Sequence, residues 1–230
     1  MLNNILVPST SPIRSMLTVP LEWVSVDMEY IRHENKFVPI EFAIFNIEKM
    51  EMLFESFIIP DFDFKVSKRL EQRGVSKNDI LQKGKSIHEI NSLLEDLLRN
   101  KVCVFWNSSF DLRQYPLLEK YAYDVRCCMK RHSERHGPYN LQFGDHNYCR
   151  LEEVASEIGF TPASGKNFHE AAVDAEATAF IWENLDKATI PGYLDLVQRN
   201  TVDDYIKGLY LEDKSETDKD VEGSPSPIPF

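Results

Sequence analysis

Asp27 and Glu29 follow the apolar, β-branched segment 23–26, which is typical of a buried strand. Residues two apart on a strand point to the same face, so we expect the two carboxylates to lie side by side at the strand end. Their repulsion in a buried place is costly unless a cation lies between them. Hard divalent ions such as Mg²⁺ and Mn²⁺ prefer oxygen ligands of this kind. The pair therefore predicts a metal site whose other ligands come from elsewhere in the chain.

A third carboxylate, Asp111, lies in the segment Asn107-Ser108-Ser109-Phe110-Asp111, directly after a short strand predicted at 102–106. Functional groups in open α/β sheets gather at such strand-to-helix turns. The same position also suits a residue that caps a helix. The segment taken alone leaves both interpretations open.

A fourth carboxylate, Asp174, belongs to an alanine-rich helix predicted at 169–185. The helical repeat places it on one face with three residues that we expect to be buried: Thr178, Ile181 and Leu185. A buried Asp needs a partner, and no Lys or Arg occurs in 168–182. A metal shared with the first two carboxylates would supply that partner.

His169 stands just before this helix and can reach the same place. An imidazole with an ordinary pKa of about 6.5 can accept a proton from water at neutral pH. A lone His is also commonly a surface residue or a core residue with its hydrogen bonds satisfied, so His169 by itself does not decide between these roles.

The elements that position these residues follow a two-part pattern. Three apolar runs at 21–30, 37–47 and 52–59 are joined by short turns, which predicts an antiparallel meander. Helices then alternate with short strands, so the order predicts an α/β fold with a mixed central β-sheet flanked by α-helices. The other predicted elements are helices at 67–73, 76–81, 86–98, 151–158 and 191–210, a helix start at 110–121, a strand at 123–129, an irregular basic surface loop at 130–148 and a flexible loop at 163–167.

Composition restricts the class of protein. The 230 residues carry a net charge of −11, which argues against a broad basic face that coats long nucleic acid but not against an enzyme that grips a chain end. We expect one domain at 21–210, an irregular leader at 1–20 and an acidic Ser/Pro-rich disordered tail at 211–230. The sequence contains neither a membrane-spanning apolar run nor a signal peptide, and its four cysteines lack framework spacing, so we expect a cytoplasmic protein with reduced thiols.

Two weaker patterns leave alternatives open. Cysteines and histidines between 127 and 149 suggest zinc, but adjacent cysteines rarely both bind one tetrahedral ion, and a buried strand explains Cys127 or Cys128 equally well. The same stretch is the most basic in the chain and is either a solvated loop or a support for the phosphates of a single strand. Trp106 and Phe110 are expected to be core residues.

Taken together, the three acid-bearing segments resemble the DEDDh, or DnaQ-like, 3′–5′ exonucleases of the ribonuclease-H-like fold, which are relatives of proofreading subunits, ribonuclease T and oligoribonuclease. The resemblance covers residues 21–185. Segment 104–112 is similar to the second motif of that family, and segment 151–159 is similar to the helix before its third motif.

The resemblance implies a role for each residue. Asp27 matches the carboxylate that bridges two metal ions, Glu29 and Asp174 match ligands of the ion that activates water, and Asp111 matches a ligand of the ion on the leaving-group side. His169 matches the general base. Two Mg²⁺ or Mn²⁺ ions about 3.5–4 Å apart neutralise both the entering and the leaving oxygen of a phosphodiester.

The first motif departs from the family pattern. The family usually has Thr and Gly after its first Glu, whereas Tyr30 and Ile31 stand here. The larger Tyr30 can stack on a base or narrow the pocket. We predict that Tyr30, Asn107 and Phe110 contact the substrate.

These patterns predict a metal-dependent 3′–5′ exonuclease that releases nucleoside monophosphates from single-stranded DNA or RNA 3′ ends, with DNA slightly favoured. One alternative is a proofreading subunit that acts with a polymerase, tethered by the tail at 212–230. The other is a catalytically silent nucleic-acid-binding module on the same fold. Many relatives are dimers, so a homodimer is a further possibility, and no membrane association is expected.

Overall fold

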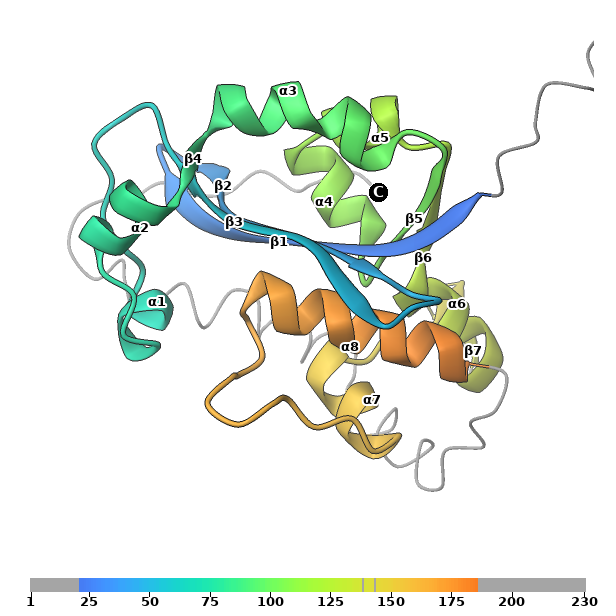
Figure 1. Cartoon of the computed structure of the whole chain (residues 1–230). Helices are drawn as coiled ribbons and strands as arrows, with labels where there is room; N and C mark the ends of the chain where they lie inside the picture. Colours follow the sequence, from blue (N-terminus) through green and yellow to red (C-terminus); the bar gives the residue numbers. More distant parts are fainter. Residues whose placement is uncertain (1–20, 138, 143, 186–230) are drawn as a thin grey trace, which may run out of the picture.

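The computed structural model of the chain describes residues 21–137, 139–142 and 144–185 (Figure 1). The predicted leader, the predicted helix at 191–210 and the predicted tail lie outside the described residues. Within the described part, no helix is long and apolar enough to cross a membrane.

A mixed sheet of six strands forms the centre of the molecule, in the order β4-β3-β2-β1-β5-β6. The first three strands form an antiparallel meander, β5 lies parallel to β1, β6 lies parallel to β5, and β4 lies parallel to β3. This arrangement confirms the predicted α/β class. The strands are β1 (Glu22–His33), β2 (Lys36–Asn46), β3 (Glu51–Ile59), β4 (Lys85–Ser86), β5 (Lys101–Phe105) and β6 (Asp124–Cys127).

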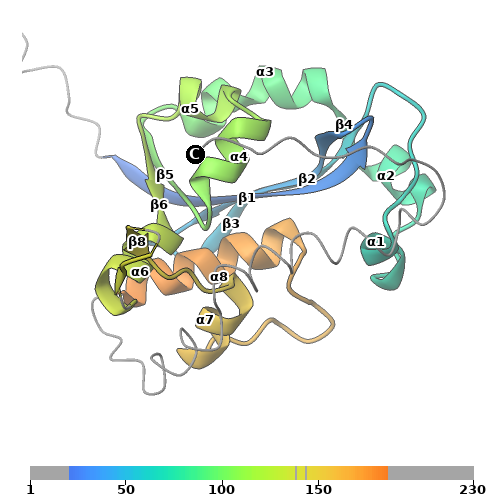
Figure 2. The same cartoon turned by 180° about the vertical axis from the view of Figure 1, so that it is seen from behind.

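Helices cover both faces of the sheet, as Figures 1 and 2 show from opposite sides. One face packs against α3 (Ile87–Leu98) and α5 (Leu117–Tyr121) through a core that includes Phe42, Phe105 and Leu94. The other face packs against α8 (Ala171–Asn184), which α7 (Leu151–Glu157) and α6 (Cys128–His136) flank. A smaller core joins α1 (Lys68–Gln72) and α2 (Lys77–Lys83) to the far end of the β1–β2 hairpin.

Local sequence explains the helix starts. Ser86 and Glu89 form a capping box at the N-terminus of α3, and Ser76 and Asp79 form a second one on α2. The apolar side of α3 is buried at Ile90, Leu94 and Leu98.

Three predicted boundaries are wrong. The expected helix 110–121 is two helices, α4 (Ser108–Gln114) and α5, because Pro116 has no N–H to continue the hydrogen-bond ladder. The expected strand 123–129 is β6 alone, and α6 begins at Cys128. The stretch 130–148 is not an irregular loop, because it contains most of α6 and a small hairpin of β7 (Tyr139–Asn140) and β8 (Asp145–His146).

Candidate active site

Asp27 and Glu29 lie in the middle of β1 rather than at its end, because the strand continues to His33. Strand geometry puts both side chains on one face of the sheet, and both line the same cavity. The pairing with β2 shifts directly after Glu29, where Glu29 lies opposite Glu41 and Tyr30 lies opposite Pro39. Irregularities of this kind are frequent beside active sites, because they change the direction of a side chain.

Asp111 lies in α4, four residues after the N-cap position, which Asn107 occupies. It therefore does not cap the helix. Its side chain is buried, and its Oδ1 accepts a hydrogen bond of 3.0 Å from the hydroxyl of Tyr30. The Tyr30 ring packs edge-on against Phe110, with 5.4 Å between centroids, and more distantly against Phe37. Tyr30 thus contacts a candidate metal ligand and also forms part of an aromatic wall.

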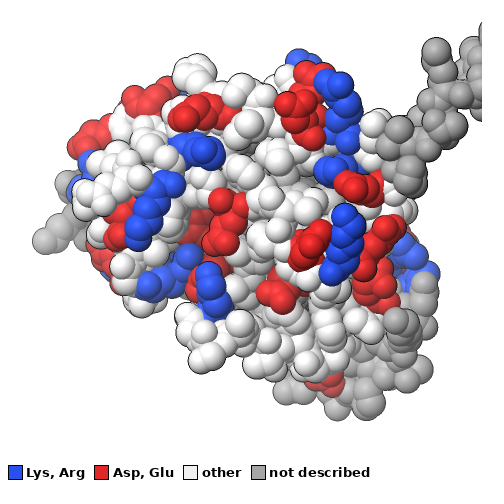
Figure 3. Space-filling view, in the orientation of Figure 1, with Lys and Arg blue, Asp and Glu red and all other residues white. Residues whose placement is uncertain are grey.

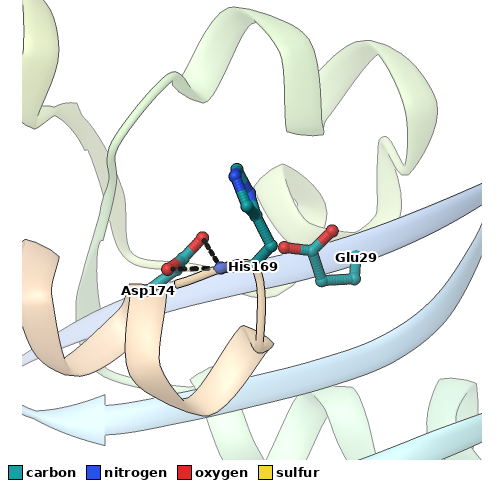
Figure 4. A group of neighbouring side chains, drawn as sticks. All are labelled: Glu29, His169 and Asp174. Carbon is teal, nitrogen blue, oxygen red and sulfur yellow. Dashed lines mark hydrogen bonds between the residues drawn. The ribbon is translucent and has the colours of Figure 1, made fainter. Parts of the chain in front are cut away.

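His169 lies just before α8 and Asp174 lies in the first turn of that helix (Figure 4). The helix begins at Ala171 with Glu170 as N-cap, so His169 precedes it and has a left-handed backbone with φ of +67°. The backbone N–H of His169 donates to both carboxylate oxygens of Asp174, at 3.1 and 3.2 Å. Asp174 is buried together with Thr178, Ile181 and Leu185, as the sequence predicted.

Ligand atoms of Glu29, His169 and Asp174 all lie within 4.8 Å of one another. Asp27 and Asp111 line the same cavity of about 340 Å³. All the sequence-predicted site residues therefore meet at one place. The remaining lining residues include the three candidate substrate contacts and several side chains that the sequence reading had not assigned: Tyr30, Asn107, Phe110, Phe37, Arg69, Arg150 and Glu152.

The four carboxyl groups destabilise one another's charged forms. Burial raises the pKa of Asp174 to about 8 and that of Asp111 to about 7. Burial and then the nearby charge of Asp174 raise the pKa of Asp27 well above its ordinary value, and burial also raises the pKa of Glu29. Oδ2 of Asp27 is buried and has no hydrogen-bond partner among the described residues. Such a set of oxygens fits the ligand preference of divalent cations.

The His169 ring has a carboxylate partner. Its Nε2 lies 3.3 Å from Oε2 of Glu152 on α7. This hydrogen bond raises the pKa of His169 and lowers the pKa of Glu152. A carboxylate in this position stabilises the protonated imidazole and fixes the orientation of its ring.

Arg73 fixes the backbone of the same segment. Its Nη1 donates to the carbonyl oxygen of His169 at 2.8 Å and also lies 2.8 Å from Oε1 of Glu41. The other oxygen of Glu41 accepts from the backbone N–H of Ala171 at 3.2 Å, and Nη2 of Arg73 lies 3.8 Å from Glu170. One buried ion pair therefore joins β2, the end of α1 and the start of α8.

The weaker sequence signals have other structural explanations. Among the residues that the structure describes, the group of potential ligands within 4.8 Å contains none of the cysteines. Cys128 is buried at the start of α6 rather than in a strand. His132, in the same helix, is also buried, and this burial lowers its pKa to about 3. In the basic stretch, Arg131 lies over the ring of Trp182 at 4.4 Å. Trp106 is a core residue as predicted, whereas the same prediction is wrong for Phe110, which is half-buried and lines the cavity.

Comparisons with solved structures show which known proteins share this fold. The chain is similar to E. coli exonuclease I, solved with a 5cy-dT13 oligonucleotide, at 14% identity over 77% of this chain and 43% of that chain, with a TM-score of 0.51. The nuclease domain of 3′hExo, a DEDDh family member bound to rAMP, matches at 12% identity over 75% of this chain and 95% of the domain, also with a TM-score of 0.51. The fold is that of the DEDDh 3′-exonucleases.

The chain is also similar to the Pan2 catalytic unit of Neurospora crassa, a protease and nuclease domain, at 15% identity and a TM-score of 0.51 over 85% of this chain and 31% of that one. The chain thus spans less than half the length of exonuclease I and of the Pan2 unit. No family model matches the chain, and no curated protein matches it.

Sequence reasoning missed Arg73, Glu41 and Glu152 as parts of the site. A signal existed for Glu41, which interrupts an otherwise apolar strand and therefore predicts a buried ion pair. Glu152 and Arg73 carry no such signal, because charged residues in short helices are ordinarily solvated.

Proposed function

We propose that this chain is a metal-dependent 3′–5′ exonuclease that hydrolyses phosphodiester bonds at single-stranded nucleic-acid 3′ ends and releases nucleoside monophosphates. The observation that carries the proposal is the convergence of Asp27, Glu29, Asp111 and Asp174 on one cavity, with His169 beside them. Acids from β1, α4 and α8 with raised pKa values are best explained by cations that share them.

Four oxygen-bearing residues would hold the ions. Asp27 would bridge two of them, Glu29 and Asp174 would complete the water-activating side, and Asp111 would serve the leaving-group side. Mg²⁺ or Mn²⁺, when bound, supplies Lewis-acid chemistry that makes water more acidic and offsets charge on the phosphate oxygens. The unpartnered Oδ2 of Asp27 supports this assignment, because a buried carboxylate oxygen ordinarily has a partner.

His169 is the proposed general base. Its ring accepts the proton of the attacking water, and Glu152 at 3.3 Å stabilises the imidazolium that results. Arg73 and Asp174 hold the backbone of His169 from its carbonyl and its N–H, which limits the positions that the ring can take.

Tyr30, Phe110 and Asn107 are the proposed contacts of the terminal nucleotide. The edge-on packing of Tyr30 on Phe110 leaves an aromatic surface at the cavity that suits a base. Because the hydroxyl of Tyr30 is engaged with Asp111, the ring is held against the metal site rather than projecting freely. A slight preference for DNA stays a prediction. One fold neighbour was solved with a DNA oligonucleotide and another with rAMP, so only matched DNA and RNA substrates can test this preference.

A 5′-labelled single-stranded oligonucleotide tests the proposal. We expect stepwise shortening from the 3′ end with Mg²⁺ or Mn²⁺ and none with EDTA. Asp111→Asn and Asp174→Asn should abolish shortening, and His169→Ala should reduce it about 10²- to 10⁴-fold, the usual contribution of general acid–base catalysis. Matched DNA and RNA of one sequence decide the sugar preference. Wild-type activity in Asp174→Asn, or shortening in EDTA, would remove the proposed site.

A catalytically silent module is the weaker alternative, because the four acids and His169 are all present and meet at one cavity. A polymerase partner, a homodimer and a cytoplasmic location stay predictions. Co-purification with a polymerase that is lost on truncation at Leu211 would favour the proofreading alternative.

A further inference from the structure

The cavity that Asp27, Glu29, Asp111 and Asp174 line is called the acid-lined cavity below. A second cavity, of about 450 Å³, adjoins it. The two cavities share five lining residues: Glu29, Tyr30, Phe37, Arg69 and His169. The second cavity lies between the start of the chain segment that forms α1 and the outer part of the β1–β2 hairpin. A ligand in the acid-lined cavity can therefore extend directly into it.

The second cavity has the opposite charge from the first. Four cationic side chains line it, namely Arg32, Lys68, Arg69 and Arg73, and Glu29 is the one carboxylate among its described lining residues. Ser67 and Gln72 add side-chain hydrogen-bond donors. In a chain with a net charge of −11, such a concentration of positive charge favours an anionic ligand.

The fold explains how the cations face this cavity. Leu70 is buried and anchors α1 in the small core with Ile31 and Ile40. Arg73 forms an ion pair with Glu41 and donates a hydrogen bond to the carbonyl oxygen of His169. Its main role is therefore to hold together the elements that surround this cavity. Lys68 and Arg32 are exposed side chains that line the second cavity but not the first.

The field of Arg69 reaches the acid cluster. Burial raises the pKa of Glu29, and the positive charge of Arg69 opposes that rise. Arg69 lines both cavities. It therefore stands at the boundary between the place for the reacting phosphate and the cation-rich cavity. In Figure 3, Lys and Arg are interspersed with Asp and Glu over the visible face.

We propose that the cation-rich cavity binds one further phosphate of the substrate, that of the linkage directly upstream of the bond that is cleaved. This proposal rests on the proposed exonuclease function and specifies its substrate class: chains that carry at least two consecutive phosphates. Each nucleotide carries one phosphate, so a strand whose scissile linkage lies at the acids brings its next phosphate to an adjacent subsite. Arg and Lys are the residues that bind phosphate in this way.

The dinucleotides pdTdT and dTdT test the proposal, because they have the same scissile linkage and differ by one upstream phosphate. Hydrolysis adds one water across that linkage, so that pdTdT gives two molecules of pdT and dTdT gives dT and pdT. We expect kcat/KM with Mn²⁺ to be about tenfold higher for pdTdT, the usual scale of a charge-assisted hydrogen bond. In the variant Arg32→Gln/Lys68→Gln this ratio should fall toward one.

Lys65→Gln is the matched control. Lys65 is an exposed cation just before α1 that lines neither cavity, so its variant should keep the wild-type ratio. With longer single strands, the slope of log KM against log salt should also become smaller in the double variant, by about 0.7 for each phosphate contact that is lost.

The outcomes separate the two proposals. Equal hydrolysis of pdTdT and dTdT by the wild-type protein, or an unchanged ratio in the double variant, would overturn the phosphate subsite and leave the exonuclease intact. Absence of hydrolysis of both dinucleotides and of longer strands would overturn the exonuclease proposal itself.

Discussion

The guanidinium of Arg73 donates a hydrogen bond of 2.8 Å to the carbonyl oxygen of His169, a residue 96 positions later in the chain. His169 has a positive φ, which is uncommon for a residue other than Gly, although His adopts it more often than most residues do. Such a conformation persists where surrounding contacts fix it. Arg73 supplies one of these contacts and Asp174 supplies another. The candidate base is therefore held by its own backbone as well as by Glu152.

Replacing Arg73 by Met should destabilise the protein strongly. The change leaves the buried Glu41 without its cation, and breaking a buried pair from one side costs about 3–5 kcal/mol. Urea unfolding monitored by circular dichroism measures the loss. The double variant Arg73→Met/Glu41→Gln should recover part of it, because no unpaired charge is left. Lys77→Met breaks an exposed pair with Asp63 and should change stability by less than about 0.5 kcal/mol.

Replacing Tyr30 by Phe should raise the metal concentration needed for half-maximal activity at pH 7. The hydrogen bond from Tyr30 holds down the pKa of Asp111, which burial raises to about 7. Without this bond the carboxyl is protonated more often, and a metal must displace that proton. The difference should shrink at pH 9, where Asp111 is ionised in both proteins. Mn²⁺ titrations at the two pH values measure it, and the exposed Tyr123→Phe serves as control.

Replacing Glu152 by Gln should move the acid limb of the kcat/KM profile to lower pH. The hydrogen bond from Glu152 raises the pKa of His169, so in the wild-type protein His169 becomes neutral, and able to accept a proton, only at a higher pH. Glu157→Gln lies on the exposed face of the same helix and should leave the profile in place. An acid limb that does not move in Glu152→Gln would show that the pair plays no part in proton transfer.

The metal-free protein should lose stability as pH rises from about 4 to about 8. The pKa values of Asp174 and Asp111 are raised to about 8 and about 7, so the folded state binds more protons than the unfolded state in this range. Stability from these groups is full below their unfolded pKa values and decreases as pH rises through the folded values. Melting temperatures in EDTA at several pH values measure this loss.

Mn²⁺ should reverse that loss, because it binds the folded state alone and stabilises by about 2.7 kcal/mol at a concentration one hundred times its Kd. The stabilisation should be greater at pH 8 than at pH 5, where protons compete for the same oxygens. Asp27→Asn removes one of the repelling charges, so it should flatten the dependence on pH in EDTA. Melting temperatures that are independent of pH in EDTA would contradict the assigned electrostatics.

The amino-acid sequence by itself determined the acids and the main layers of the fold. Asp27 and Glu29 share a face because strands have a period of two, and the buried face of α8 follows from its apolar repeat around Asp174. Both signals are local, so they can be read without knowing which segments meet. The same local reasoning failed at 130–148, where polar composition concealed α6, a helix whose His132 and Ser133 are buried.

Only the tertiary structure decided what surrounds the acids. Arg73, Glu152 and the cations of α1 reach the site through contacts between segments far apart in the sequence, such as the 130 positions between Glu41 and Ala171. No local period encodes such a contact, because a charged side chain in a short helix has the same sequence pattern whether it faces solvent or a cavity. The folded chain therefore decides which charges support the candidate base and which line the proposed phosphate subsite.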